Sequence, residues 1–144
     1  MTETETNDTV GLGARVRQFY AVQMRLLDSG EAEAWADTFT EDAVFEANAH
    51  KQPTRGRRAI AAAARAAAAE LRAAGTTRRH WLGMCDVAPE EDGTVRVYSY
   101  ALIIETPAGG PSVVRMSTTC EDLLVDDGGL RVRHRIVARD DIVP

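Results

Sequence analysis

The order of apolar patterns along the chain constrains the fold more than any single motif does. Apolar side chains recur at three- and four-residue spacing from Leu12 to Leu27, which predicts an amphipathic helix. Asp28-Ser29-Gly30 predicts the end of that helix, because glycine readily takes the left-handed conformation found there. Trp35 and Phe39, four residues apart, predict a short second helix that is followed by a turn at Thr40-Glu41-Asp42. The chain is therefore expected to open with two helices in a hairpin.

A third helix and a long β region are expected next. A short strand is predicted around Ala43 to Glu46, and a polar loop over Ala47 to Arg55. Arg57 to Ala74 is rich in alanine, the best helix former, so it is predicted to be a helix that approaches a sheet closely. Turn residues then separate the predicted strands Arg78 to Val87, Val95 to Glu105, Val113 to Val125 and Leu130 to Arg139. Neighbours of this kind form an antiparallel meander, and helices followed by such a sheet indicate an α+β fold.

Composition narrows the class of protein. The 144 residues suit a single domain, predicted over residues 10–144, with a disordered polar tail over residues 1–9. A net charge of −5 argues against nucleic acid as the main partner. Neither a run of apolar residues long enough to cross a membrane nor a secretory signal is found, so a cytoplasmic location is expected. Histidines and cysteines lack the spacing of metal ligands, and no dinucleotide loop is present, so neither metal nor cofactor is predicted.

Alternation along two strands bears on what faces the core. Along the last strand Leu130, Val132, His134 and Ile136 alternate with Arg131, Arg133 and Arg135. This predicts one apolar face, which includes His134, and one charged, solvent-facing side that carries the arginines. Tyr98 and Tyr100 share the face of their strand opposite to Val97, Ser99 and Ala101, and the sequence leaves open which face looks inward. If the small residues face inward, they leave room for a ligand. Cys85 and Cys120 are expected to be buried thiols and not a disulfide.

The segments LLDSGEAEAW, FTEDAVFEANAH and RRHWLGM, in this order, resemble nuclear-transport-factor-2-like proteins. That superfamily includes scytalone dehydratase, ketosteroid isomerase, limonene epoxide hydrolase and the SnoaL-like polyketide cyclases. The resemblance covers nearly the whole chain. It implies a cone-shaped barrel in which a curved antiparallel, partly mixed sheet wraps around three N-terminal helices. It also implies a homodimer formed through the sheet.

The same resemblance implies an acid/base pair. Scytalone dehydratase and related small dehydratases carry a histidine followed by an aromatic residue, an aliphatic residue and glycine, as His80 is here. In those enzymes the histidine pairs with an aspartate at the end of the first helix, and Asp28 is the matching position. The resemblance therefore implies that His80 carries the proton and that Asp28 orients it. As alternatives, Asp28 is a helix cap and His80 is a strand-end histidine bonded to backbone.

Several differences from the active-site residues of these enzymes narrow the range of reactions that the resemblance implies. The region of the second histidine of scytalone dehydratase, Ile103-Ile104-Glu105, has none, and Leu27 stands where that enzyme has a tyrosine. Ala47 occupies the position of the base of ketosteroid isomerase, and VRVYSYA lacks the Arg-x-Asp pair of limonene epoxide hydrolase. The remaining expectation is a cofactor-independent cyclase, dehydratase or isomerase that acts on a hydrophobic oxygenated substrate, such as a polyketide intermediate in antibiotic biosynthesis.

A pocket between the helices and the sheet would hold that substrate. The residues expected to bind it are Tyr20, Gln23, Met24, Trp35, Phe39, Phe45, Met84, Ser99 and His134. Each of the aromatic residues is also consistent with a plain core position. The alternative function is a non-catalytic role, either ligand binding or assembly, which resembles that of the small subunit of ring-hydroxylating dioxygenases.

Overall fold

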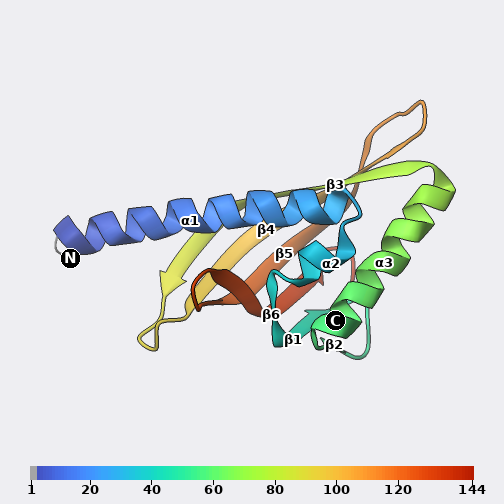
Figure 1. Cartoon of the computed structure of the whole chain (residues 1–144). Coiled ribbons are helices and arrows are strands. Elements are labelled where there is room, and N and C mark those ends of the chain that lie inside the picture. Colours follow the sequence, from blue (N-terminus) through green and yellow to red (C-terminus); the bar gives the residue numbers. More distant parts are fainter. Residues whose placement is uncertain (1–2) are drawn as a thin grey trace.

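The computed structural model describes the backbone of residues 3–144 and the side chains of residues 10–144. The disordered tail was predicted over residues 1–9. Residues 1 and 2 lie outside the described residues, and the side chains of residues 3–9 are not described, so the disorder stays a prediction. The elements follow the order α1 Glu3–Asp28, α2 Ala32–Ala36, β1 Phe39–Ala47, β2 Thr54–Arg55, α3 Arg57–Ala74, β3 Thr76–Pro89, β4 Val95–Pro107, β5 Val113–Asp126 and β6 Leu130–Arg139. Figure 1 shows α1 lying along the sheet, with α2 beside the C-terminal part of α1 and α3 further along the same end of the molecule.

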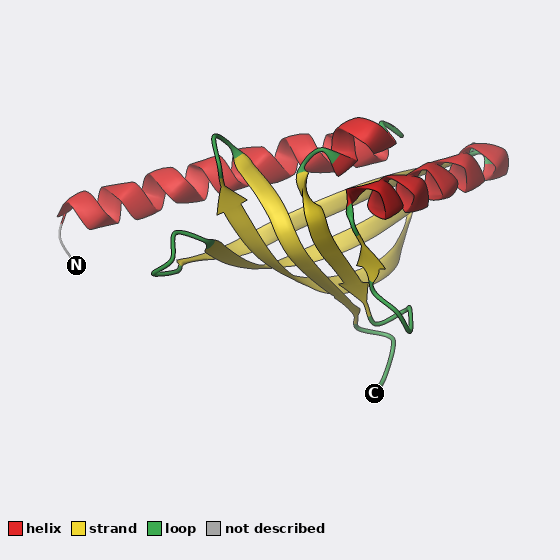
Figure 2. Ribbon diagram, turned by 60° about the horizontal axis from the view of Figure 1, so that its bottom comes forward, coloured by secondary structure: helices red, strands yellow, loops and turns green. Residues whose placement is uncertain are grey.

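The strands form one mixed sheet in the order β2-β1-β6-β5-β4-β3. Strands β3 to β6 form the predicted antiparallel meander, and β1 runs parallel to β6. The sheet curves strongly, and the helices lie on one side of it (Figure 2). The predicted α+β fold is confirmed, except that the sheet is open and does not close into a barrel, because β2 and β3 remain as its two edges.

Glycines end both long helices, as the sequence predicts. Gly30 follows α1 with a φ of 75°, and Gly75 caps α3 with a φ of 64°. Side chains with a β-carbon rarely adopt these angles, so the chain turns sharply at both places. Tight turns here bring the end of α1 beside the start of β3, which positions the candidate site.

The second helix is shorter than predicted, because Phe39 belongs to a strand. α2 ends at Ala36, and the Thr38 hydroxyl then donates to the Trp35 carbonyl at 2.6 Å. The Val132 amide donates to the Thr38 carbonyl at 2.9 Å, which draws the chain into the sheet. Phe39 thus begins β1, and the turn predicted at 40–42 is instead an irregular part of that strand. Two aromatic residues four positions apart can lie on one face of a helix, but the same spacing also occurs where a helix ends and a strand begins.

The alternation predicted for β6 breaks in the middle of the strand. Leu124 pairs with Val132, but Leu123 pairs with His134, so Arg133 is an extra residue on β6. Such a bulge reverses which face the following side chains occupy. Arg135 is consequently buried, with 3% of its surface exposed, and Ile136 is 37% exposed. The prediction that His134 lies on the apolar side is therefore wrong.

The concave face of the sheet carries small residues. Val97, Ser99 and Ala101 are buried, whereas Tyr98 and Tyr100 point outward and are 45% and 61% exposed. Met84 lies in a β3 irregularity with a φ of 56° and is 79% exposed. Its side chain borders a hollow between α1 and β3, together with Tyr20 and His80.

Candidate active site

A cavity of about 360 Å³ lies between the concave face of the sheet and the helices. Its wall is mainly apolar and is built from every layer of the fold. Apolar side chains that form it include Met24, Leu27, Trp35, Phe45, Ile60, Leu82 and Ile103. The volume falls within the range of sites for small organic molecules, and an apolar wall excludes water from the groups that reach into it.

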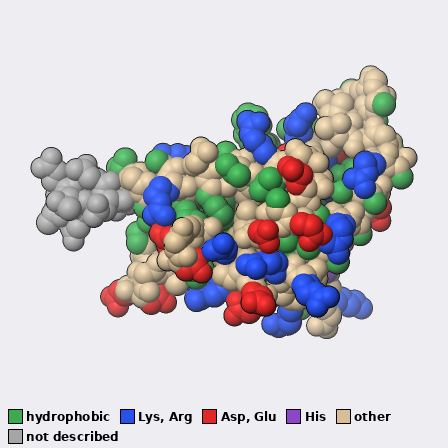
Figure 3. Space-filling model, viewed as in Figure 1, with side chains coloured by type: hydrophobic (Ala, Val, Ile, Leu, Met, Phe, Trp, Pro, Cys, Tyr) green, Lys and Arg blue, Asp and Glu red, His purple; other side chains and the backbone are tan. Residues whose placement is uncertain are grey.

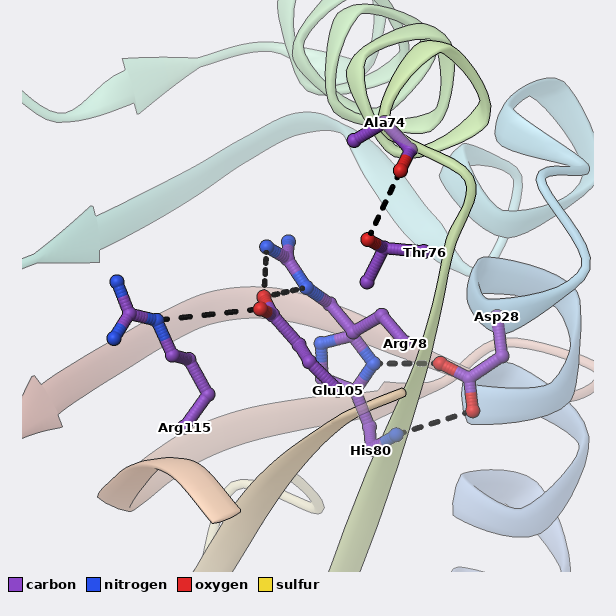
Figure 4. A network of polar contacts seen from close by, with 7 residues as sticks. All are labelled: Asp28, Ala74, Thr76, Arg78, His80, Glu105 and Arg115. Carbon is purple, nitrogen blue, oxygen red and sulfur yellow. Dashed lines mark hydrogen bonds and ion pairs between the residues drawn. The ribbon is translucent and has the colours of Figure 1, made fainter. Parts of the chain in front are cut away.

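The side chains of Asp28 and His80 meet at this cavity (Figure 4). One Asp28 oxygen lies 2.6 Å from His80 Nδ1, and the other accepts the His80 backbone N–H at 3.1 Å. A carboxylate accepts hydrogen bonds only, so Nδ1 carries a proton in this contact, and in the neutral ring Nε2 keeps its lone pair. His80 lines the cavity, whereas Asp28 does not line it but borders two neighbouring hollows that His80 also lines. The side chains are 21% and 11% exposed, respectively.

The position of Asp28 is electrostatically unfavourable without its partner. Asp28 is the last residue of α1, where the helix dipole places partial negative charge and disfavours a carboxylate. The His80 backbone amide and imidazole both donate to it and offset that cost. Local arrangements that cost free energy, such as a carboxylate at the C-terminal end of a helix, are common at functional sites. The contact predicted from the sequence is thus present, and its catalytic role stays a prediction.

A second ion pair, Arg78 with Glu105, lies near the Asp28–His80 dyad, and Arg78 is on the same strand as His80. Arg78 lines the cavity and donates through Nε and Nη2 to one oxygen of Glu105, at 3.1 and 2.7 Å. Arg115 Nε lies 4.0 Å from the other Glu105 oxygen, as Figure 4 shows. Glu105 therefore neutralises much of the positive charge of Arg78 at the cavity wall.

Asp122 and Arg135 form a buried ion pair that sequence reasoning missed. Arg135 Nε and Nη2 donate to the two Asp122 oxygens at 2.9 and 2.8 Å, and both side chains are at most 3% exposed. Tyr20 donates its hydroxyl proton to Asp122 at 2.7 Å, and Gln23 accepts from Arg135 Nη2 at 2.7 Å. Gln23 donates in turn to Thr38 at 2.7 Å. This buried network consists of Tyr20, Gln23, Thr38, Asp122 and Arg135.

Burial and the Asp122 carboxylate set the protonation states of this network. Burial raises the pKa of Tyr20, and the neighbouring Asp122 charge raises that pKa further. Burial by itself would lower the pKa of Arg135, but the Asp122 carboxylate outweighs it and holds that pKa above its ordinary value. Tyr20 therefore keeps its proton and directs it at Asp122, so it cannot stabilise an oxyanion in the cavity.

The predicted site residues fall into three groups. Met24, Trp35, Phe45 and His80 line the cavity, and Asp28 contacts it through His80, while their roles stay predictions. Residues buried behind its wall are Tyr20, Gln23, Phe39 and Ser99. Met84 and His134 lie outside the cavity, and His134 pairs instead with Glu46 at a half-exposed position.

The missed wall residues include Arg135 and Cys120. Arg135 was hidden by the β6 bulge, for which the sequence gives no clear signal. Cys120 was predicted to be buried, but nothing in its sequence context placed it at a cavity.

The reactivity of the Cys120 thiol tests how well the wall of the cavity is shielded from solvent. Burial raises the pKa of its thiol to about 11, compared with 9.0 for an ordinary cysteine. At pH 8 this leaves about a hundredfold less thiolate than an unburied cysteine would have. We expect Cys120 in a Cys85→Ser variant to react with iodoacetamide at least that much slower than free cysteine at pH 8, and faster as the pH approaches 11. Mass spectrometry measures the rate, and alkylation at the rate of free cysteine would contradict the burial of Cys120 at the cavity wall.

Other classes of site are less well supported. Among the described residues, no group of three or more histidine, cysteine, aspartate or glutamate side chains is arranged to hold a metal ion. Within the same part of the chain, no helix is both long and apolar enough to span a membrane. Lysine and arginine are interspersed with aspartate and glutamate over the face seen in Figure 3, so that face presents no continuous cationic stripe of the kind that binds nucleic acid.

Comparisons with known proteins agree with this geometry. A family model described as the SnoaL-like domain matches residues 12–136. The structure of Aln2 from a Streptomyces species is 38% identical, with a TM-score of 0.84 over 91% of this chain and 92% of that one. ActVI-ORFA from Streptomyces coelicolor is 31% identical, with a TM-score of 0.85 over 94% and 99% of the two chains.

Two further solved structures are similar to this chain. A protein from Catenulispora acidiphila, solved in complex with S-DNPA, is 35% identical and covers 92% of this chain and 96% of its own, with a TM-score of 0.78. The beta subunit of a putative aromatic-ring-hydroxylating dioxygenase from Novosphingobium aromaticivorans is 18% identical, with a TM-score of 0.72 over 93% and 94% of the chains, and this likeness concerns the fold alone. A comparison with the curated proteins found no match.

Proposed function

The chain belongs to the SnoaL-like domain family, and on that premise we propose that it is a cofactor-independent acid/base enzyme. The observation that carries the proposal is the 2.6 Å contact between His80 Nδ1 and Asp28 at an apolar cavity. A carboxylate so placed fixes the tautomer and the orientation of the imidazole. It also stabilises the imidazolium that forms when the ring takes a proton.

The proposed chemistry begins with removal of a proton from carbon. His80 Nε2 takes a proton from a carbon next to a carbonyl group, and the electrons of the C–H bond move onto the carbonyl oxygen. The imidazolium then returns its proton to a leaving hydroxyl group, which completes a dehydration, or to another carbon, which completes an isomerisation. In a ring closure, the enolate carbon would form a bond to a second carbonyl carbon of the same molecule, and the imidazolium would give its proton to the alkoxide oxygen that results. An apolar wall that excludes water favours each of these outcomes over side reactions.

The proposed substrate is a hydrophobic, oxygenated molecule of the polyketide type. The mainly apolar wall and the volume of about 360 Å³ support a compact ring-containing ligand. The Catenulispora acidiphila relative was solved in complex with S-DNPA, which supports ligand binding by this fold. A role in antibiotic biosynthesis and a cytoplasmic location remain part of this proposal.

Exchange of carbon-bound hydrogen tests the chemistry without knowledge of the natural substrate. 2-Tetralone, a two-ring ketone with acidic protons beside its carbonyl, is incubated with the protein in D₂O. We expect its proton signals at these carbons to disappear faster than in buffer alone, as followed by ¹H NMR. If 2-tetralone binds without any faster exchange, the enzyme reading fails and a ligand-binding role is favoured.

The alternative is a non-catalytic subunit or ligand carrier. The fold likeness to a dioxygenase beta subunit and an apolar outer sheet face are compatible with it. An obligatory assembly subunit is expected to need a different, larger partner, whereas the enzyme reading predicts a stable homo-oligomer. The mass of the purified protein in solution therefore discriminates between the two.

We propose that the homodimer forms through the outer face of the sheet. Trp81, Tyr98 and Tyr100 are 71%, 45% and 61% exposed, and Leu102 pairs directly with Trp81 on the neighbouring strand. Large aromatic groups on one surface are typical of protein interfaces. Light scattering is expected to give a dimer for the natural sequence and a monomer for Tyr100→Lys, which buries a charge at the contact. Val22→Lys, at an exposed valine of α1, should remain dimeric, and a monomeric natural protein would contradict the proposal.

A further inference from the structure

The arginine and histidine residues give the cavity wall a basic character. They are His50, Arg78, His80, Arg135 and Arg139, and no aspartate or glutamate within the described part of the chain lines the cavity. The carboxylates that pair with the three arginines contact them without lining the cavity themselves. A ligand in the cavity therefore meets positive charge but no carboxylate, which favours anionic ligands over cationic ones.

Arg78 differs from the other two arginines of the wall in how its charge is balanced. Each of the other two is bound by both oxygens of an aspartate. Glu105 accepts from Arg78 through one oxygen, and its other oxygen lies 4.0 Å from Arg115 Nε. Two guanidinium groups thus share one carboxylate, so a net positive charge remains at this part of the wall.

One terminal nitrogen of Arg78 is available to a ligand. Nε and Nη2 donate to Glu105, whereas Nη1 has no hydrogen-bond partner among the described residues. Figure 4 shows this nitrogen turned away from Glu105. It is not sealed inside the protein either, because Trp35 Nε1 is the one side-chain polar atom of the described residues that is both buried and unpaired. Arg78 Nη1 therefore reaches open space.

Arg78 lies where the cavity meets a second hollow. That hollow, of about 200 Å³, lies between the end of α1, α3 and the start of β3, and both Arg78 and His80 line the two spaces. The Arg78 side chain is 28% exposed. An anion bound at this border keeps part of its hydration, so it avoids the large free-energy cost of burying a charge among apolar groups.

Strand β3 sets the distance between Arg78 and the dyad. Arg78 and His80 are two residues apart on this strand, so their side chains leave the same face about 6.6 Å apart. Both side chains line the cavity. This separation suits a ring system that carries a carboxylate on a short side chain, with a ring carbon facing His80 while the carboxylate contacts Arg78.

We propose that Arg78 binds a carboxylate group of the ligand at the edge of the cavity, while a hydrophobic ring system fills the apolar part. Arg78 is thus a specificity-determining residue that selects acids over neutral molecules of the same shape. Glu105 lowers the affinity, because its carboxylate repels that of the ligand. The inference rests on the proposed function only in calling this ligand the substrate, since binding requires no catalysis.

The test compares two ligands of nearly the same shape: 2-naphthylacetate, which is ionised at pH 7.5, and the neutral 2-naphthylacetamide. Calorimetry measures both dissociation constants. We expect the natural protein to bind the acid about tenfold more tightly than the amide, because a hydrogen bond between two charged groups is stronger than one to a neutral group. Arg78→Gln should abolish this preference and leave the affinity for the amide within about twofold.

Two matched variants separate binding by Arg78 from a general effect of charge. Arg65→Gln also removes one positive charge, but Arg65 pairs with Glu33 at an exposed position and lines neither space, so the preference should persist. Glu105→Gln keeps an acceptor for Arg78 and removes the competing charge, so it should raise the affinity for the acid about threefold and leave that for the amide unchanged.

Four results would overturn the proposal. They are equal affinities of the natural protein for the two ligands, a preference that survives Arg78→Gln, a preference lost in Arg65→Gln, and a preference that Glu105→Gln leaves unchanged. The exchange assay with 2-tetralone separates this proposal from the proposed function. A protein that prefers the acid but catalyses no exchange would refute only the proposed function, and exchange without the preference would refute only the carboxylate site.

Discussion

His80→Ala is expected to lower the rate of proton exchange on 2-tetralone by about a thousandfold. Removal of a general base typically costs two to four orders of magnitude, because the C–H bond must then be broken by water or buffer. In this protein the loss should be near the middle of that range, since Nε2 is the one imidazole nitrogen of the dyad free to face the substrate. The rate is measured by ¹H NMR in D₂O, with circular dichroism to verify the fold.

Two further variants make this expectation specific. Asp28→Asn should also reduce exchange strongly, because an amide can donate to Nδ1 and so favour the tautomer that has its proton on Nε2. His134→Ala is a matched control, since His134 also pairs with a carboxylate, that of Glu46, but lies outside the cavity. It should retain the natural rate. Near-normal exchange in both His80→Ala and Asp28→Asn would remove the dyad from the chemistry.

Local patterns were sufficient to predict most of the fold. The bounds of α3 follow from a run of alanine between two glycines, and the meander follows from turn residues between apolar strands. The contact between Asp28 and His80 followed from the resemblance to small dehydratases and not from any spacing in the chain. Their separation of 52 positions is bridged only because two glycine turns bring the end of α1 and the start of β3 together.

The parts that could not be predicted depend on long-range pairing. Phe39 was assigned to a helix because its spacing from Trp35 suits one, but hydrogen bonds to β6 place it in a strand. Arg135 was assigned to the solvent face because alternation was assumed to continue, and one extra residue at Arg133 reversed it. A bulge is fixed by which residues of β5 and β6 pair, and a single strand carries no record of that choice. The buried network was missed for this reason.

The network and the dyad together fasten α1 to the sheet. Tyr20 binds Asp122, Gln23 binds Arg135 and Asp28 binds His80, so three polar contacts lie along one helix face between apolar residues. Hydrogen bonds have directional requirements that apolar packing lacks, and they therefore fix the helix in one register. A cavity of defined shape beneath α1 follows from this arrangement.

Asp122→Ala is expected to cause the largest loss of stability, about 3–5 kcal/mol in the free energy of unfolding, because it leaves the buried Arg135 guanidinium without a counter-charge. Chemical denaturation in urea measures the change. The double variant Asp122→Leu, Arg135→Met should recover only part of the loss, since it removes the buried charge but leaves the Tyr20 hydroxyl and the Gln23 carbonyl without partners. Arg15→Ala breaks an exposed ion pair between α1 and β5, Arg15 with Asp126, and should cost less than about 1 kcal/mol. If Asp122→Ala is no more destabilising than Arg15→Ala, the buried pair does not hold α1 on the sheet.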